Sequence, residues 1–207
     1  MITLGHRQGS AILTIARTDK ANSLTEEMLQ HLTAHLDDLA ASDCRAVILT
    51  GAGRVFSAGA DLDAARAGLA VSPEWERLSA RVASMPCLTI AALNGTAAGG
   101  ALGMVLACDL RIAVPEARIF YPVMRLGFLP QPSDPIRLRA LVGPSRAKMI
   151  LMAGQKIGAA EALAWGLIDR LSGPDSLIDD ALALAGDCLA AAPDHVATIK
   201  GMIDRAI

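Results

Sequence analysis

Residues 94–109 read Asn-Gly-Thr-Ala-Ala-Gly-Gly-Ala-Leu-Gly-Met-Val-Leu-Ala-Cys-Asp, and the rest of the chain is arranged around this stretch. The apolar run Leu88–Leu93 leads into it and predicts a buried strand. Asn94 and Gly95 then turn the backbone, and Gly99-Gly100 marks the point where a helix begins. N–H groups at a helix start are unsatisfied, and glycines there let a ligand oxygen approach the backbone closely. The stretch therefore predicts a strand feeding a helix whose first turn can hold negative charge, although close packing of helix on strand would call for the same small residues.

A second stretch of small residues lies upstream of the first. Ser57-Ala-Gly-Ala60 follows the buried strand predicted at Ala46–Thr50, and its lack of side-chain bulk suits a ligand in close contact with the backbone. Asp61 comes next and is placed to cap a following helix. In the helix after Gly100, we expect one buried face made of Leu102, Val105 and Leu106.

Length and composition restrict the class of protein. The 207 residues suit one domain, and a hydrophobic fraction of 53% is ample for a core. Proline, glycine or a charge interrupts every apolar run before it reaches the length of a membrane span. The mean hydropathy of +0.40 is therefore better explained by apolar surfaces that contact other subunits. The net charge of −2 indicates neither a nucleic-acid partner nor an anionic membrane. Scattered cysteines without metal-ligand spacing, and an N-terminus without a signal-peptide profile, predict a cytoplasmic protein.

Local patterns predict the remaining elements. Strands are expected at 2–4, 11–16, 110–114 and 118–121, the first two as a hairpin. Ser23 and Glu26 fit a capping box, and Ser133 or Asp134 can cap a helix that Pro135 begins. The helix after the capping box carries one apolar face, made of Met28, Leu29, Leu32, Leu36 and Leu39. Further helices are expected at 73–84, 145–152, 159–164, 176–191 and 194–206.

Several polar residues have structural explanations. His31 and His35 are four residues apart, but no third ligand lies near them, so we interpret them as exposed helix surface. Asp109 is expected to be a buried, hydrogen-bonded residue at a strand edge. Solvated helix charges are expected at Asp63, Arg66, Glu74 and Arg77.

Three motif blocks occur in order along the chain. The first is Phe56-Ser-Ala-Gly-Ala-Asp-Leu62, and the second is Asn94-Gly-x-Ala-x-Gly-Gly with Cys108-Asp109 downstream. The third runs from Ala153-Gly-x-x-Ile157 through Ala159-x-Glu-Ala-x-x-Trp-Gly-Leu-Ile168. Together they resemble the signature of the crotonase (enoyl-CoA hydratase/isomerase) family, and the resemblance extends from about Thr3 to the last residue.

The resemblance implies an α/β fold with a crotonase-like ββα spiral core followed by C-terminal helices. Residues 1–207 then form a single domain, with the spiral core in 1–140 and a helical trimerisation part in 141–207. Most members continue for several tens of residues into helices that help cover the acyl pocket, so this sequence is C-terminally short. A homotrimer or hexamer is implied in the same way.

Family members bind a CoA thioester and hold its carbonyl oxygen with two backbone N–H groups. The motif match assigns these groups to Ala60 and Gly100. Donors of this kind stabilise an enolate as it forms, and one of them can contribute about 3–4 kcal/mol. Coenzyme A enters as part of the substrate, and no tightly bound cofactor or metal is expected. The nucleotide and pantetheine are implied to bind along the loop 17–24 and the segment 58–62, at Arg17, Lys20, Ala21, Ala58, Asp61 and Leu62.

Hydratases of the family use two glutamates that this chain lacks. The first position is Gly103, three residues after the oxyanion glycine, and the second is Val123, directly after the proline of Tyr121-Pro-Val123. Because neither side chain can transfer a proton, the addition of water lacks its usual acid and base. Family members with an aspartate further along the loop would place it near Gln131. Of the polar residues left nearby, only Asp134 has a useful unperturbed pKa, and helix capping explains that residue as well.

These features predict an acyl-CoA-binding enzyme of the family, a lyase or isomerase of fatty acid metabolism, with non-standard acid–base residues. The alternative is a catalytically inactive paralogue that binds acyl-CoA or a partner subunit. A carboxylate from elsewhere, such as Glu74, also stays open as the acid or base. A serine hydrolase is disfavoured, because Ser57 has no recognisable His/Asp partners and no Gly-x-Ser-x-Gly elbow occurs.

Overall fold

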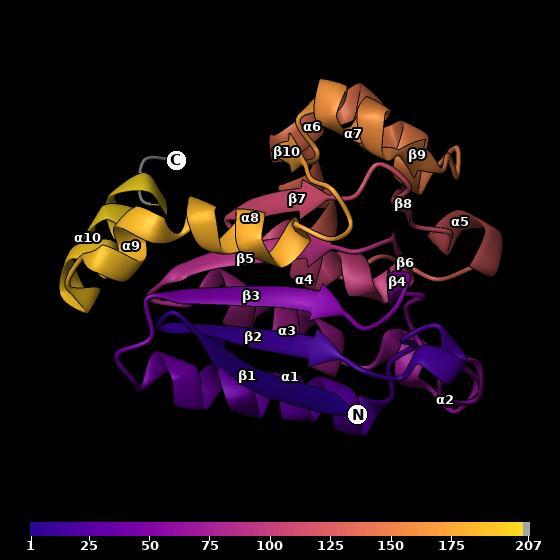
Figure 1. Ribbon diagram of the computed structural model, residues 1–207. Helices are drawn as coiled ribbons and strands as arrows, with labels where there is room; N and C mark the ends of the chain where they lie inside the picture. The colour runs from indigo at the N-terminus through magenta and orange to yellow at the C-terminus, as the bar shows by residue number, and fades with distance from the viewer. Residues whose placement is uncertain (205–207) are drawn as a thin grey trace.

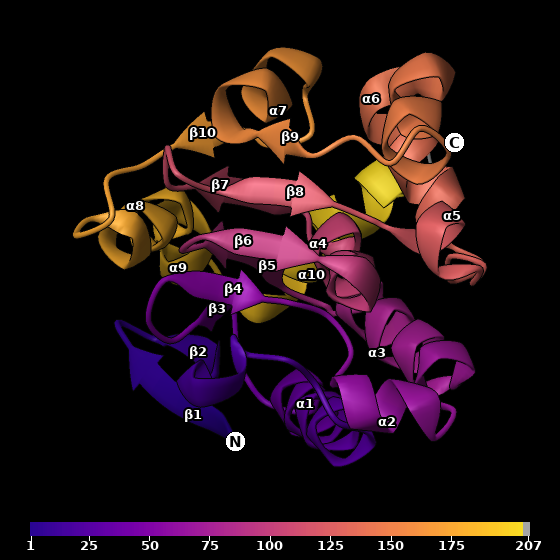
Figure 2. The same cartoon turned by 90° about the vertical axis from the view of Figure 1, so that its right-hand side faces the viewer.

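A computed structural model describes residues 1–204, and two β-sheets organise it (Figure 1). In this part of the chain, the strands of the larger sheet follow the order β1 (Ile2–Arg7), β2 (Ser10–Ile15), β3 (Ala46–Gly51), β5 (Leu88–Leu93), β7 (Leu110–Ala113) and β10 (Arg170–Leu171). Those of the smaller sheet follow the order β4 (Val55–Ser57), β6 (Thr96–Ala98), β8 (Arg118–Phe120) and β9 (Ile157–Gly158). Figure 2 shows the strands of the smaller sheet side by side.

Each turn of the chain contributes one strand to each sheet. The successive pairs are β3 with β4, β5 with β6, and β7 with β8, and the strands from neighbouring turns pair in parallel. Antiparallel pairing occurs in the β1–β2 hairpin and between β8 and β9. This arrangement confirms the predicted α/β fold with a crotonase-like ββα spiral core.

Helices cover both faces of the larger sheet, with α1, α3 and α4 behind it and α8 in front in Figure 1. The α-helices are α1 (Glu26–Ala40), α2 (Leu62–Arg66), α3 (Glu74–Ala83), α4 (Leu102–Ala107), α5 (Val123–Leu126), α6 (Asp134–Leu151), α7 (Ala159–Trp165), α8 (Leu177–Leu184), α9 (Gly186–Ala190) and α10 (Pro193–Asp204). Short 3₁₀ helices are η1 (Thr18–Lys20), η2 (Leu69–Val71) and η3 (Gly99–Ala101). The predicted apolar face of α1 is buried, at Met28, Leu29, Leu32, Leu36 and Leu39.

The helix caps differ from the prediction. Thr25 rather than Ser23 precedes α1, and its hydroxyl oxygen accepts a hydrogen bond from the Met28 N–H at 3.3 Å. Neither Ser133 nor Asp134 caps α6 with its side chain, because other groups engage both. In addition, α4 is buried on every side instead of on one face, so it lies at the centre of the fold.

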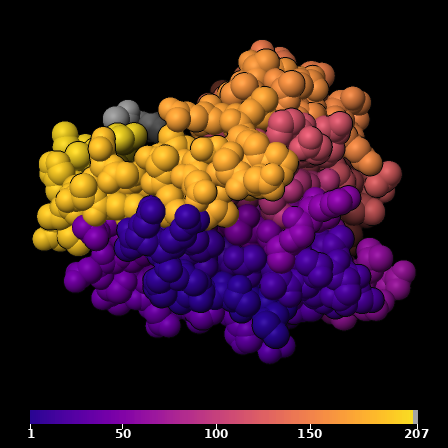
Figure 3. Space-filling view, viewed as in Figure 1, coloured from indigo at the N-terminus to yellow at the C-terminus, as the bar shows by residue number. Residues whose placement is uncertain are grey.

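The C-terminal segment contributes strands as well as helices. β9 pairs with β8 in the smaller sheet, and β10 pairs with β7 in the larger sheet. The helix expected at 176–191 is divided into α8 and α9. Figure 3 shows the C-terminal helices, in yellow, lying alongside the indigo N-terminal residues. Arg7 of β1 pairs there with Asp179 of α8 at 2.6 Å. The helix predicted at 194–206 begins at Pro193, and its last two residues lie outside the described part. Within residues 1–204, no helix is both long enough and apolar enough to cross a bilayer.

Asp109 links the start of β7 to β5 and to the C-terminal helix. Its carboxylate accepts hydrogen bonds from the Thr89 N–H at 2.8 Å and hydroxyl at 2.9 Å, and it pairs with Lys200 of α10 at 2.8 Å. The predicted hydrogen-bonded role at a strand edge is confirmed, although the residue is half-buried rather than buried.

Candidate functional site

Two glycines from neighbouring turns of the spiral touch where strands of the smaller sheet end. Gly59 follows β4 and Gly99 follows β6, and their φ angles are +93° and +58°. A Cβ on Gly59 would lie 2.8 Å from the Ala98 carbonyl oxygen and 3.3 Å from the Gly99 Cα, so both the backbone conformation and the close contact require glycine. The peptide groups that follow these two residues belong to Ala60 and Gly100. The contact therefore brings the two predicted donors into one small region.

The Ala60 N–H points away from the segment that pairs with it. Leu24 donates its N–H to the Gly59 carbonyl at 2.8 Å and accepts a hydrogen bond from the Asp61 N–H at 2.9 Å. Because the N–H and C=O of a trans peptide point in opposite directions, the Ala60 N–H faces the other side. No hydrogen bond found within residues 1–204 uses this N–H. Gly100 lies in the first turn of η3, where N–H groups have no partner inside the helix.

The residues predicted to receive the nucleotide and pantetheine lie on the adjoining surface. The Ala58 N–H donates to the Ala21 carbonyl at 3.0 Å, which joins the loop 17–24 to the segment after β4. Lys20 and Leu62 are exposed, and the Leu62 side chain is 75% accessible. The structure thus places this predicted set on one surface.

Arg17 and Asp61 form the second link between these segments. Arg17 Nη1 lies 2.8 Å from Asp61 Oδ2 and also donates to the Ser23 carbonyl at 3.2 Å. The Asp61 carboxylate accepts hydrogen bonds from the N–H groups of Asp63 and Ala64, which confirms the predicted cap of α2. The Ala64 hydrogen bond and then the Arg17 guanidinium lower the pKa of Asp61. The Arg17 charge is therefore already compensated within the protein.

Trp75 of α3 covers one side of Gly100. A Cβ on Gly100 would lie 3.0 Å from the indole carbons Cδ2 and Cε3, so a larger residue there would press against the ring. The indole is buried, and its Nε1–H donates to the Leu69 carbonyl at 2.8 Å. Local sequence patterns do not predict this contact, because it depends on how α3 packs against α4.

Asp134 fills the space beside Gly103, one turn after Gly100. A Cβ on Gly103 would lie 3.1 Å from Asp134 Oδ1 and 3.5 Å from the Ser79 Cβ. Asp134 is completely buried, and its Oδ2 accepts a hydrogen bond from the Tyr121 hydroxyl at 2.9 Å. Its Oδ1 is buried without a hydrogen-bond partner among residues 1–204. The capping role predicted for Asp134 is wrong, and a side chain at position 103 would make a tight contact with its carboxylate.

Contacts between α3 and the start of α6 hold Asp134 in this position. The Glu76 carboxylate accepts hydrogen bonds from the Ser133 N–H at 3.2 Å and from the Ser133 hydroxyl. Arg137 Nη1 donates to Ser79 Oγ at 2.9 Å. Burial raises the pKa of Asp134 to about 6, and the nearby Glu76 charge raises it by a smaller amount. The hydrogen bond from the Tyr121 hydroxyl and the Arg137 charge act in the opposite direction and lower this pKa. The carboxylate can therefore change its protonation state near neutral pH.

Other residues considered from the sequence have different surroundings. Val123 is a buried apolar residue at the start of α5, and Gln131 accepts a backbone hydrogen bond through its carbonyl. Ser57 is completely buried, and its hydroxyl donates to the Asn22 carbonyl at 2.8 Å, which is a structural role. The prediction of a solvated charge is wrong for Glu74, whose side chain is only 15% exposed and whose Oε2 has no hydrogen-bond partner in the described chain.

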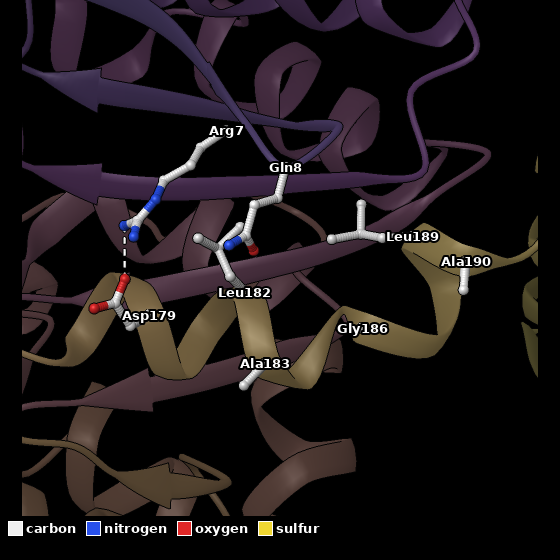
Figure 4. Close-up of a pocket in the computed structure, with 8 residues that line it drawn as sticks. All are labelled: Arg7, Gln8, Asp179, Leu182, Ala183, Gly186, Leu189 and Ala190. Carbon is white, nitrogen blue, oxygen red and sulfur yellow. Dashed lines mark ion pairs between the residues drawn. The ribbon is translucent and has the colours of Figure 1, made fainter.

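A separate groove of about 640 Å³ lies between the β1–β2 hairpin and α8–α9 (Figure 4). Arg7 and Gln8 reach toward it from the hairpin, and Leu182 and Leu189 line it from the helices. None of its lining residues belongs to the predicted site.

The two sheets wound from ββα turns, with paired glycines at the ends of β4 and β6, define a crotonase-like spiral protein. The family model for enoyl-CoA hydratase/isomerase matches residues 5–207. The chain belongs to the enoyl-CoA hydratase/isomerase family.

Relatives and solved structures agree with this assignment. A putative enoyl-CoA hydratase of Thermus thermophilus is 37% identical over 202 residues, which cover 93% of this chain and 79% of that protein. A putative enoyl-CoA hydratase/isomerase of Bacillus subtilis is 36% identical over 205 residues, or 95% of this chain and 78% of that protein. The crystal structure of an enoyl-CoA hydratase from Bacillus anthracis superimposes with a TM-score of 0.92 at 32% identity, covering 99% of this chain and 82% of the other.

Proposed function

We propose that this protein is an enzyme that binds an acyl-CoA thioester and stabilises the enolate of its acyl group with the backbone N–H groups of Ala60 and Gly100. The observation that carries the proposal is the contact between Gly59 and Gly99, which directly precede these two N–H groups. Family membership supports the same ligand, because the relatives are named enoyl-CoA hydratases. The reaction class is that of a lyase or isomerase acting on acyl-CoA, within fatty acid metabolism.

The two donors act on the charge that develops during the reaction. Removing a proton from the carbon next to the thioester moves an electron pair onto the carbonyl oxygen. An N–H group aimed at that oxygen lowers the barrier, and loss of one such donor typically costs about 3–4 kcal/mol. The nucleotide and pantetheine then lie along the loop 17–24 and the segment 58–62. There Lys20 is a candidate for phosphate contact, because Arg17 already pairs with Asp61.

The Ala60 donor is tested most cleanly by removing only its N–H. We expect that replacing Ala60 with L-lactate, which turns the amide into an ester, weakens acyl-CoA binding or abolishes turnover while the thermal unfolding curve stays near that of the parent. A proline at position 100 is a poorer test, because any side-chain carbon there meets the Trp75 ring. A folded ester variant that binds and reacts like the parent would show that Ala60 is not a donor.

Hydration of crotonyl-CoA should be slow in the parent protein. Each general acid or base typically contributes about 10²–10⁴-fold, and Gly103 and Val123 supply neither. The measurement follows loss of the enoyl thioester by ultraviolet absorbance, with an ordinary hydratase of the family as the control and binding measured separately by calorimetry. Rates like those of the control would contradict this interpretation of the two positions. Binding without turnover of any acyl-CoA would favour the alternative, an inactive acyl-CoA-binding paralogue.

A further inference from the structure

One oxygen of a fully buried carboxylate is without a hydrogen bond in the centre of the fold. Asp134 Oδ2 is bound by the Tyr121 hydroxyl, but Oδ1 has no partner within residues 1–204. A buried polar atom without a partner is costly and calls for an explanation. We propose that Asp134 is the acid–base residue of this site and exchanges a proton with the α-carbon of the thioester. The inference rests on the proposed function.

The helix that carries Gly100 also places Asp134. Gly100 and Gly103 are three residues apart across the junction of η3 and α4, so they lie about 5–6 Å apart on one side of it, and the Trp75 ring covers this side at Gly100. The carboxylate lies beside Gly103, and Oδ1 would be 3.1 Å from a Cβ there. A thioester oxygen held about 3 Å from the Gly100 N–H has its α-carbon only two bonds away. The α-carbon would therefore lie near Gly103, the residue that Asp134 Oδ1 adjoins.

The position also explains why a glycine occupies residue 103. A Cβ at this residue would lie 3.1 Å from the nearest Asp134 carboxylate oxygen, which is closer than an ordinary van der Waals contact, so the carboxylate would have to shift. In this proposal the start of α6, rather than α4, carries the acid–base group. It reaches the same region of the site from another helix.

The proposed step is balanced without any further reactant. The Asp134 carboxylate takes the α-proton, so a C–H bond breaks and an O–H bond forms. The electron pair of the C–H bond becomes the enolate, whose oxygen is held at Ala60 and Gly100. After the proton on Asp134 exchanges with solvent, its return to the α-carbon regenerates the thioester with a solvent hydrogen at that carbon. With one such group, the site suits reactions that need a single proton carrier, such as α-proton exchange or migration of a double bond, rather than the addition of water.

The charged groups around Asp134 set the pH at which it acts. Burial raises its pKa to about 6, the Tyr121 hydrogen bond and the Arg137 charge lower it, and the Glu76 charge from α3 raises it. Because the carboxylate is the base, exchange should rise with pH through about 6 and then level off. A change at Tyr121 and a change at Glu76 should therefore move this pH profile in opposite directions.

The test measures incorporation of solvent deuterium at the α-carbon of butyryl-CoA by mass spectrometry. The parent should incorporate deuterium faster than buffer does, and Asp134→Asn should reduce the rate by about 10²–10⁴-fold. Asparagine can still accept the Tyr121 hydrogen bond, so binding of butyryl-CoA should change by less than about threefold. Asp38→Asn, at an exposed position on α1, serves as the matched control and should exchange like the parent.

Two further variants separate a chemical role from a structural one. Tyr121→Phe should shift the midpoint of the exchange profile to higher pH, and Glu76→Gln should shift it to lower pH. An unchanged exchange rate in Asp134→Asn would overturn the assignment, and so would profiles that do not move. A parent that binds butyryl-CoA without exchange would overturn the assignment while leaving the proposed binding function intact. A parent that fails to bind would overturn both.

Discussion

At the scale of single residues, Gly103 and Asp134 have to be considered together. The sequence shows that position 103 lacks a carboxylate, but it cannot show what takes up the space. Position 134 lies 31 residues further along the chain, and its side chain lies beside Gly103 where hydrogen bonds to Glu76 and Ser79 on α3 hold the start of α6. The local sequence pattern therefore predicted a helix cap at residue 134, but tertiary contacts place its carboxylate in the protein interior instead.

The buried carboxylate should reduce stability above neutral pH. The pKa of Asp134 is raised from 3.8 to about 6 in the folded state, so the folded protein binds this proton more tightly than the unfolded chain. The parent therefore loses stability as the pH rises through this range, and the loss persists at higher pH. Asp134→Asn removes the charge, and at about pH 8 it should increase the free energy of unfolding by up to roughly 3 kcal/mol. Near about pH 4 the difference should be small.

Urea unfolding of the two proteins at both pH values measures this difference. Asp38→Asn is again the control, because an exposed charge should change the free energy of unfolding little at either pH. An Asp134→Asn protein that is less stable than the parent at the higher pH would indicate that the carboxylate contributes stabilising contacts instead.

At the scale of helices and strands, the sequence predicts an element correctly where neighbouring residues alone carry its pattern. Buried strands such as β3 and β5 are apolar runs ended by turn residues, and their observed bounds match the expected ones within a residue. The two helices expected on either side of Gly143-Pro144 are also present, as a single element that bends there. The short α5 was not expected, because four residues carry too little pattern to distinguish a helical turn from a loop.

The bend in α6 depends on a glycine. Gly143 has φ +79° and ψ 167°, a conformation that only glycine adopts without strain, although a Cβ there would meet no atom within 4 Å. Gly143→Ala should therefore lower the free energy of unfolding by about 1–3 kcal/mol. Gly186→Ala is the matched control, since its Cβ also meets nothing and its backbone is not in the left-handed region. That change should be neutral or stabilise the protein by up to about 1 kcal/mol, and equal effects at both positions would contradict the explanation by backbone strain.

At the scale of the whole molecule, the family-level fold was predictable because three motif blocks occur in order. What the sequence could not show is which apolar residues stay on the surface. A set of large apolar side chains is exposed on and around α5 and at the start of α6, namely Met124, Leu126, Phe128, Leu129 and Ile136. Exposed apolar residues gathered on one part of a protein are typical of protein–protein contacts. We propose that the protein forms a homotrimer or hexamer, and that this surface adds to the contact expected from the helical trimerisation part in 141–207.

The assembly prediction is tested by light scattering at micromolar concentration. The parent should have the mass of a trimer or a hexamer, and Leu129→Asp should shift the population toward monomer, because a charge would have to be buried in the contact. Leu129 is 85% exposed, and Val71→Asp, at a position that is 72% exposed on η2, is the control that should leave the mass unchanged. A monomeric parent would refute the assembly, and a trimeric Leu129→Asp protein would exclude this surface from the contact.

The most direct test of the central claim observes the thioester carbonyl itself. Acyl-CoA labelled with ¹³C at the thioester carbonyl is bound to the protein, and the carbonyl stretch is recorded by isotope-edited infrared difference spectroscopy. Two hydrogen bonds from the backbone polarise the C=O bond, so the band of the bound ligand should move to lower frequency than in water. The lactate variant at Ala60 should reverse part of that shift. A bound ligand whose carbonyl band stays at its solution frequency would contradict the account.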